Sequence, residues 1–133
     1  MPRESKKISD LVILNVDDNP ESLYTKDRLL RLKGFTVANA TTGKAALDLA
    51  HRLHPDLILL DVHLPDIDGR EVCRRVKEHP DLANIPVVLA SATLRGHAEH
   101  LDGLRWAGAD GYIAEPFEVE ALESTIRRVL KLL

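Results

Sequence analysis

Five short apolar runs, each followed by a stretch with helical periodicity, constrain the fold of this chain more than any other feature of its sequence. Several runs are apolar at successive positions, which is typical of strands buried on both faces of a sheet. The runs cover residues 11–16, 35–38, 57–60, 85–90 and 112–114. The pattern therefore predicts five β–α units rather than an antiparallel or all-helical domain.

The stretches between the runs carry the residues that begin and end helices. Asn19 is a predicted N-cap followed by Pro20, and Gly34 closes the same helix. Thr42 is a predicted N-cap of a second helix, which ends at His54 because Pro55 follows. Further helices are expected over residues 70–78, over residues 96–107 and from residue 118 to the end of the chain.

Alternating strands and helices predict an α/β domain with a parallel sheet covered by helices on both faces. Right-handed crossovers leave few topologies, and the flavodoxin-like (βα)5 order 2-1-3-4-5 is the common solution at this size. The chain has 133 residues, which suits one domain over residues 11–133 after a short flexible segment, residues 1–10.

Charge and cysteine content exclude several classes of function. The net charge of −3 and the absence of a basic surplus argue against binding to nucleic acid or membranes. The single cysteine, Cys73, rules out an internal disulfide and suits a reducing compartment. Residues 1–10 lack the apolar core of a signal peptide, and no apolar run is long enough to span a bilayer. We therefore expect a soluble, cytoplasmic protein.

Acidic residues follow two strands that are neighbours in the predicted order. Asp17 and Asp18 follow the first strand, and Asp61 follows the third. Each alone is ordinarily a helix cap or a strand terminator. Together at one sheet edge, they would raise each other's pKa unless a cation neutralised them, and their oxygen atoms suit Mg²⁺. Beside this metal an aspartate could act as a nucleophile, and Ser91 after the fourth strand could donate to a phosphoryl oxygen.

Five motifs, in this order and at this spacing, resemble the receiver domain of bacterial response regulators. The resemblance covers residues 11–133 and is carried by Val16-Asp17-Asp18, the run from Asp61 to Gly69, Ser91-Ala92, the run from Gly108 to Tyr112, and Pro116-Phe117. It implies that Asp61 is the phosphoacceptor. It also implies that Mg²⁺, or another divalent cation such as Mn²⁺ or Ca²⁺, is bound by Asp18, Asp61 and the backbone carbonyl of His63, with Asp17 holding metal-bound water.

The same resemblance implies roles for residues around the acids. Ser91 would move toward the phosphoryl group, and Tyr112 would turn inward with it as the aromatic switch. Pro65 and Gly69 would shape the loop after the phosphoacceptor. The peptide bond before Pro116 would be cis, a geometry that is rare except before proline.

One residue departs from the family pattern. Receivers normally carry lysine immediately before this proline, and its ammonium pairs with phosphoryl oxygens, whereas here the residue is Glu115. The formal charge of the site changes from about −2 to about −4, which favours divalent cations and disfavours phosphoryl groups. Arg95, in the loop after the fourth strand, is a candidate replacement cation.

Two functional hypotheses follow, with a third of another class. The first is a phosphoryl-accepting switch that is no enzyme beyond its own phosphorylation and dephosphorylation and takes its phosphoryl group from a histidine kinase or phosphotransfer protein. It would signal to a downstream protein through the surface from Gly96 to Leu133, where Trp106 is a candidate contact, and homodimerisation through this surface stays open.

The second hypothesis, supported by Glu115, is a pseudo-receiver that binds proteins independently of phosphorylation. A small phosphatase fits poorly, because His63 stands where such enzymes place a second acid. No output domain is expected within these residues, so the chain acts alone or is part of a longer regulator or hybrid kinase.

Overall fold

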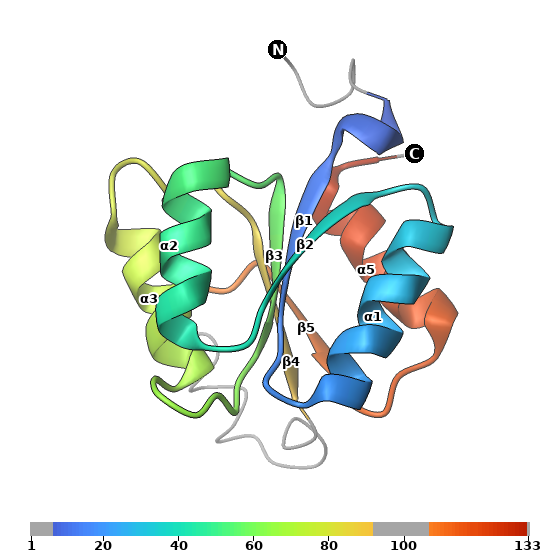
Figure 1. Ribbon diagram of the computed structural model, residues 1–133. Coiled ribbons are helices and arrows are strands. Elements are labelled where there is room, and N and C mark those ends of the chain that lie inside the picture. Colours follow the sequence, from blue (N-terminus) through green and yellow to red (C-terminus); the bar gives the residue numbers. More distant parts are fainter. Residues whose placement is uncertain (1–6, 92–106, 133) are drawn as a thin grey trace.

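Five parallel strands form a single sheet in the computed structural model, which describes residues 7–91 and 107–132 (Figure 1). The strands lie in the order β2-β1-β3-β4-β5, which confirms the predicted flavodoxin-like topology. Their bounds are Val12–Val16 for β1, Thr36–Ala40 for β2, Leu57–Asp61 for β3, Val87–Ser91 for β4 and Gly111–Ala114 for β5.

The second strand differs from its predicted bounds of residues 35–38. It begins at Thr36 and continues to Ala40, because the whole length of β1 pairs with it, from Val12 opposite Thr36 to Val16 opposite Ala40. The side chains of Asn39 and Ala40 do not form a continuous apolar run with Val37, so hydrophobicity alone ends the strand too early. Pairing with a neighbouring strand sets the boundary instead.

Helices cover both faces of the sheet, as the alternating pattern predicts. Helices α1 (Pro20–Leu32) and α5 (Val119–Leu130) lie on one face, and α2 (Gly43–Leu53) and α3 (Gly69–Glu78) lie on the other (Figure 1). The predicted helix over residues 96–107 falls almost entirely outside the described residues. None of the helices that the structure describes is long and apolar enough to cross a membrane.

The predicted ends of the first two helices are confirmed, but the last helix ends at Leu130 rather than at the end of the chain. The Asn19 side chain accepts a hydrogen bond from the Ser22 amide at 3.0 Å, and Thr42 Oγ1 accepts one from the Ala45 amide at 3.0 Å. Each satisfies an amide that lacks a partner within the first helical turn. Gly34 adopts a φ of 100° after α1, a conformation that glycine adopts without steric cost.

The sheet separates two layers of apolar core. One layer packs α2 and α3 against the sheet through residues such as Ala46, Val72 and Val76. The other packs α1 and α5 through residues such as Leu30 and Ile126. With both faces covered, the chemistry of the domain is left to the ends of the strands, where side chains can reach solvent.

The described residues that precede β1 pack against the core. Residues Ile8–Asp10 form a short 3-10 helix, and Ile8 packs against the core layer beneath α1 and α5. The Thr36 hydroxyl donates to the carbonyl oxygen of Ser9 at 2.8 Å. These contacts fasten the entry to β1 onto the start of β2.

Candidate functional site

Three carboxylates from different strand ends meet at the carboxyl edge of the sheet. Asp17 follows β1, Asp61 ends β3, and Glu115 follows β5, and one oxygen from each lies within 4.8 Å of the others. The register explains part of this convergence, since Val16 lies opposite Leu60 and the next residues are Asp17 and Asp61. The sequence analysis predicted that Asp17, Asp18 and Asp61 meet. The structure instead groups Asp17 and Asp61 with Glu115, whereas Asp18 is exposed and is not one of the three.

Asp17 is fully buried and held from two sides. Its Oδ1 accepts a hydrogen bond from the Asn19 amide at 3.0 Å, and its Oδ2 lies 3.0 Å from the ammonium of Lys26. Burial disfavours the charged form, but the hydrogen bonds from Ser22 and Asn19 and the charge of Lys26 outweigh it and lower the pKa of Asp17. Asp17 is therefore a fixed negative charge inside the site.

Asp61 is partly exposed, and its pKa is shifted in the opposite direction to that of Asp17. Its Oδ1 accepts a hydrogen bond from the His63 amide at 3.0 Å. Burial, together with the negative charge of Asp17, raises the pKa of Asp61 to about 6 against the ordinary 3.8, although the His63 amide and Lys26 oppose the shift. At neutral pH the Asp61 carboxylate is mostly ionised. Burial and the nearby charge of Asp17 disfavour this ionised form, so binding of a cation would stabilise it.

The loop after Asp61 is held by contacts of Gly69 with the end of β3 and of Asp66 with the start of α2. A Cβ atom added to Gly69 would lie 2.1 Å from the backbone oxygen of Asp61, and the Gly69 amide donates to the Val62 carbonyl at 2.8 Å. Within the loop, the Asp66 carboxylate accepts from the amides of Gly43 and Lys44 at the start of α2. Only glycine fits at position 69, which agrees with the loop-shaping role implied for it.

The remaining predicted residues surround the acids at different depths. Asp18 is exposed and follows Asp17 directly, and His63 is exposed in the loop after β3. Ser91 is buried at the end of β4, and its carbonyl accepts a hydrogen bond from the Glu115 amide at 3.1 Å. Tyr112 on β5 is partly buried against the core layer of α2 and α3. The Glu115–Pro116 peptide bond is cis, as expected.

Lys26 is the site residue that the sequence analysis missed. It projects from α1, is 1% exposed, and places its Nζ 3.0 Å from Asp17 Oδ2 and 3.2 Å from Glu115 Oε1. With this ammonium counted, the formal charge of the site is about −3 rather than about −4. Arg95, the expected replacement cation, lies outside the described residues. A lysine three residues after Leu23 and four before Leu30, on the inward stripe of α1, was the overlooked signal.

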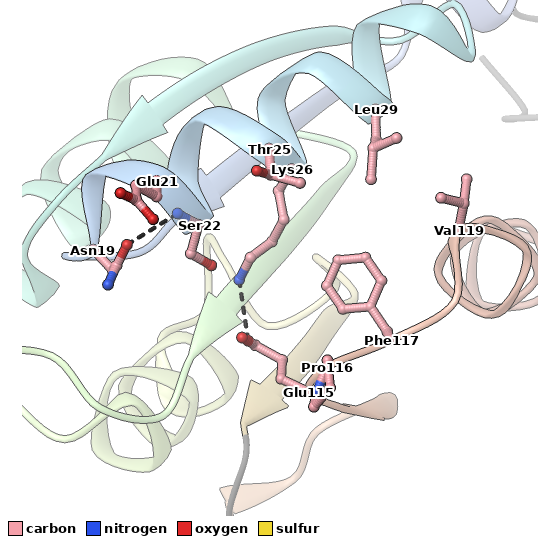
Figure 2. A pocket seen from close by; sticks show the side chains of 10 residues that line it. All are labelled: Asn19, Glu21, Ser22, Thr25, Lys26, Leu29, Glu115, Pro116, Phe117 and Val119. Carbon is pink, nitrogen blue, oxygen red and sulfur yellow. Dashed lines mark hydrogen bonds and ion pairs between the residues drawn. The ribbon is translucent and has the colours of Figure 1, made fainter.

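A groove of about 510 Å³ opens beside the site, between α1 and the segment that links β5 to α5 (Figure 2). Figure 2 shows the Lys26 side chain reaching from α1 toward Glu115, with Phe117 further along the groove. The groove is lined by Asn19, Glu21, Ser22, Thr25, Lys26, Leu29, Glu115, Pro116, Phe117 and Val119. Its polar end adjoins the acids, and its other end is apolar.

Comparison with known proteins places this architecture in a family. The family model for the response regulator receiver domain matches residues 13–127, which is most of the chain. The chain belongs to the response regulator receiver domain family. Receiver domains are signalling switches of two-component systems rather than enzymes in the usual sense.

Curated relatives include both stand-alone and longer regulators. The chain is 34% identical to the polar-differentiation response regulator DivK of Brucella ovis over 119 residues, covering 89% of this chain and 94% of DivK. It is 37% identical to a protein of Galdieria sulphuraria named probable transcriptional regulator ycf27, covering 90% of this chain but 45% of that protein. The chain thus spans less than half the length of the ycf27 relative and nearly all of DivK.

Solved receiver structures agree with the fold and include one with a metal ion. The receiver domain of sensor histidine kinase PA1611 from Pseudomonas aeruginosa, 27% identical with a TM-score of 0.83, contains magnesium coordinated in its active site cleft. The match covers 91% of this chain and 98% of that domain. The chemotaxis protein CheY4 of Vibrio cholerae superimposes with a TM-score of 0.83 at 27% identity, covering 90% of this chain and 98% of CheY4.

Proposed function

We propose that this receiver domain is a phosphorylation-dependent switch with Asp61 as the phosphoacceptor. The observation that carries the proposal is the convergence of Asp17, Asp61 and Glu115 at one sheet edge, with Asp61 partly exposed among them. A nucleophile must be accessible to a donor, whereas the charge that holds a cation can be buried. Asp61 is accessible to a donor, and Asp17 is the buried charge.

The reaction transfers a phosphoryl group from a phosphohistidine of a histidine kinase or phosphotransfer protein. An Asp61 carboxylate oxygen attacks the phosphorus, the phosphorus–nitrogen bond breaks, and its electron pair returns to the imidazole, leaving an acyl phosphate on Asp61. A pKa of about 6 leaves most Asp61 side chains ionised at pH 7 and available for attack. Hydrolysis of the acyl phosphate by water would reset the switch.

The donor set fits a hard divalent cation such as Mg²⁺, Mn²⁺ or Ca²⁺. Carboxylate oxygens of Asp17 and Asp61 lie within 4.8 Å of each other, and Asp18 and the His63 carbonyl are the further expected ligands. When bound, the cation screens the charge of the incoming phosphoryl group. Asp17, which is buried and ionised, is expected to hold metal-bound water rather than to accept the phosphoryl group.

The phosphoryl group would act by shifting the population between two conformations. Ser91 is placed next to Glu115 through a backbone hydrogen bond, and Tyr112 lies one strand away on β5. We infer that Ser91 and Tyr112 relay the state of Asp61 to the surface from Gly96 to Leu133. Of this surface the structure describes residues 107–132, which include β5 and α5, and a downstream protein or a second copy of the chain would bind there.

A pseudo-receiver is the second candidate, and the observation that favours it is Glu115. A carboxylate in place of the usual lysine adds negative charge where a phosphoryl dianion must bind. In that case the domain would bind its partner in one conformation whatever its phosphorylation state.

Intact-mass measurement after incubation with Mg²⁺ and a small-molecule phosphodonor separates the two candidates, with Asp61→Asn as the control. The switch predicts a gain of one phosphoryl mass in the wild type and none in the control. If Mg²⁺ binds but no mass is gained, the pseudo-receiver is the better description. In that case Glu115→Lys, which restores the usual residue, would be tested for recovered phosphorylation.

A further inference from the structure

Among the described residues, the most buried cationic side chain lies against the acid cluster. Lys26 is 1% exposed, and long cationic side chains are seldom buried unless an opposite charge compensates the loss of hydration. Both compensating groups belong to the acid cluster, with Asp17 Oδ2 at 3.0 Å and Glu115 Oε1 at 3.2 Å. The ammonium therefore lies between the ends of β1 and β5.

We propose that Lys26 supplies, from helix α1, the phosphoryl-binding charge that the family ordinarily supplies from the residue before the cis-proline, and that Glu115 holds it in place. The inference rests on the proposed function, because it concerns how phospho-Asp61 is neutralised. In this arrangement the positive charge of the site has moved from the residue after β5 to α1, and Glu115 is its partner rather than a lost function.

The geometry gives Lys26 the reach that this role requires. Oxygens of Asp17 and Glu115 lie within 4.8 Å of an Asp61 oxygen, so a cation in contact with both carboxylates lies near Asp61, and its charge acts to lower the pKa of Asp61. The ammonium has three N–H donors, and among the described residues two carboxylates pair with it. The proposal assigns the third donor to an oxygen of the phosphoryl group.

The negative charge of Glu115 requires a positive charge at Lys26. With Lys26 absent, Glu115 would face the phosphoryl dianion directly and repel it. With lysine at position 115 and Lys26 retained, two ammonium groups would crowd Asp17. Opposite charges at positions 26 and 115 avoid both conflicts, whereas a purely structural ion pair would need no place beside Asp61.

Moving the positive charge from position 26 to position 115 by mutation tests the proposal. The variants are Lys26→Met, Glu115→Lys and the double variant Lys26→Met/Glu115→Lys, with Lys33→Met as the matched control. Lys33 follows the end of α1 and pairs with Glu123 outside the acid cluster. Three quantities are measured: the initial phosphorylation rate by intact mass, the affinity for beryllofluoride as a phosphoryl analogue in the presence of Mg²⁺, and the affinity for Mg²⁺ alone.

For Lys26→Met we expect the phosphorylation rate and the beryllofluoride affinity to fall about tenfold or more, since a charged hydrogen bond is lost. The affinity for Mg²⁺ alone is expected to rise, because a positive charge next to the carboxylates is gone. A loss of structure would lower all three quantities together. The double variant should recover phosphorylation and beryllofluoride binding, and Lys33→Met should match the wild type.

The outcomes distinguish failure of this inference from failure of the proposed function. If the wild type is phosphorylated and folded Lys26→Met matches it within about twofold in both rate and beryllofluoride affinity, Lys26 is only a structural cation. If the wild type gains no phosphoryl mass and binds no beryllofluoride, the proposed function fails and the role of Lys26 fails with it. Should Lys26→Met not fold by circular dichroism, Lys26→Gln, whose amide can still donate to Asp17, is judged by the same limits.

Discussion

Replacing Asp61 with asparagine should stabilise the metal-free domain at neutral pH. The pKa of Asp61 is raised to about 6 from 3.8, so the folded chain holds this proton more tightly than the unfolded chain does. Between about pH 4 and pH 6 the stability therefore falls as the pH rises. Above that range the ionised carboxylate destabilises the fold, and asparagine removes this charge while keeping the shape of the side chain.

The magnitude follows from the size of the shift and the exposure of the side chain. The interval from 3.8 to about 6 corresponds to an upper limit of about 3 kcal/mol. Because the Asp61 side chain is partly open to solvent, screening reduces this limit, and we expect a gain of about 1 kcal/mol for Asp61→Asn at pH 7.5. The gain should vanish near pH 4, where the wild-type carboxyl is protonated in the folded chain.

Urea unfolding followed by circular dichroism, in a chelating buffer at several pH values, measures this difference. Asp66→Asn is the control with the opposite sign, because hydrogen bonds from the amides of Lys44 and Gly43 lower the pKa of Asp66. The ionised Asp66 carboxylate therefore stabilises the folded chain at neutral pH, and this stabilisation is lost as the pH falls. Asp66→Asn should accordingly lower the free energy of unfolding at pH 7.5. If Asp61→Asn is no more stable than wild type while Asp66→Asn behaves as expected, the electrostatic description of Asp61 is wrong.

Three further predictions concern the framework around the site. Gly69→Ala should cost about 3 kcal/mol in urea unfolding, because the new Cβ would meet the Asp61 carbonyl at 2.1 Å; an effect below about 1 kcal/mol would contradict the close approach. Cys73 should resist thiol reagents at pH 8 until the chain unfolds, since its thiol is buried and its pKa is raised to about 12. Asn19→Ala should cost about 1 kcal/mol by loss of the α1 cap, and Asn19→Ser should retain most of that stability.

The predicted fold agrees closely with the structure because its signals are local. Apolar runs, caps and the alternation of periods determine which residues form strands and helices, and handedness leaves one common strand order. The bounds of β2 were less accurate, since Asn39 and Ala40 belong to the strand through their pairing with Asn15 and Val16 on β1. A ladder partner 24 residues away is not visible in a window of hydrophobicity.

The candidate site was predictable to the extent that its residues end strands. Asp17, Asp61 and Ser91 were assigned to one sheet edge from strand order alone, and the structure brings Asp17 and Asp61 together there. Lys26 was not assigned, because a lysine on a helix is ordinarily a solvated charge and no local pattern says that one faces inward to an acid. The close approach of Gly69 to the Asp61 backbone supplies a steric reason for a glycine that the sequence marked only by resemblance.

By itself, then, the sequence determined the elements, the strand order and the edge at which the acids gather, since each follows from short-range periodicity and the chirality of the chain. Only the tertiary structure decided the charge of the site. The Lys26–Glu115 ion pair joins residues 89 positions apart, and it forms because α1 and the segment after β5 contribute Leu30 and Phe117 to the same core layer on one face of the sheet. Electrostatic energy depends on distance in space, which a linear pattern of charges does not specify.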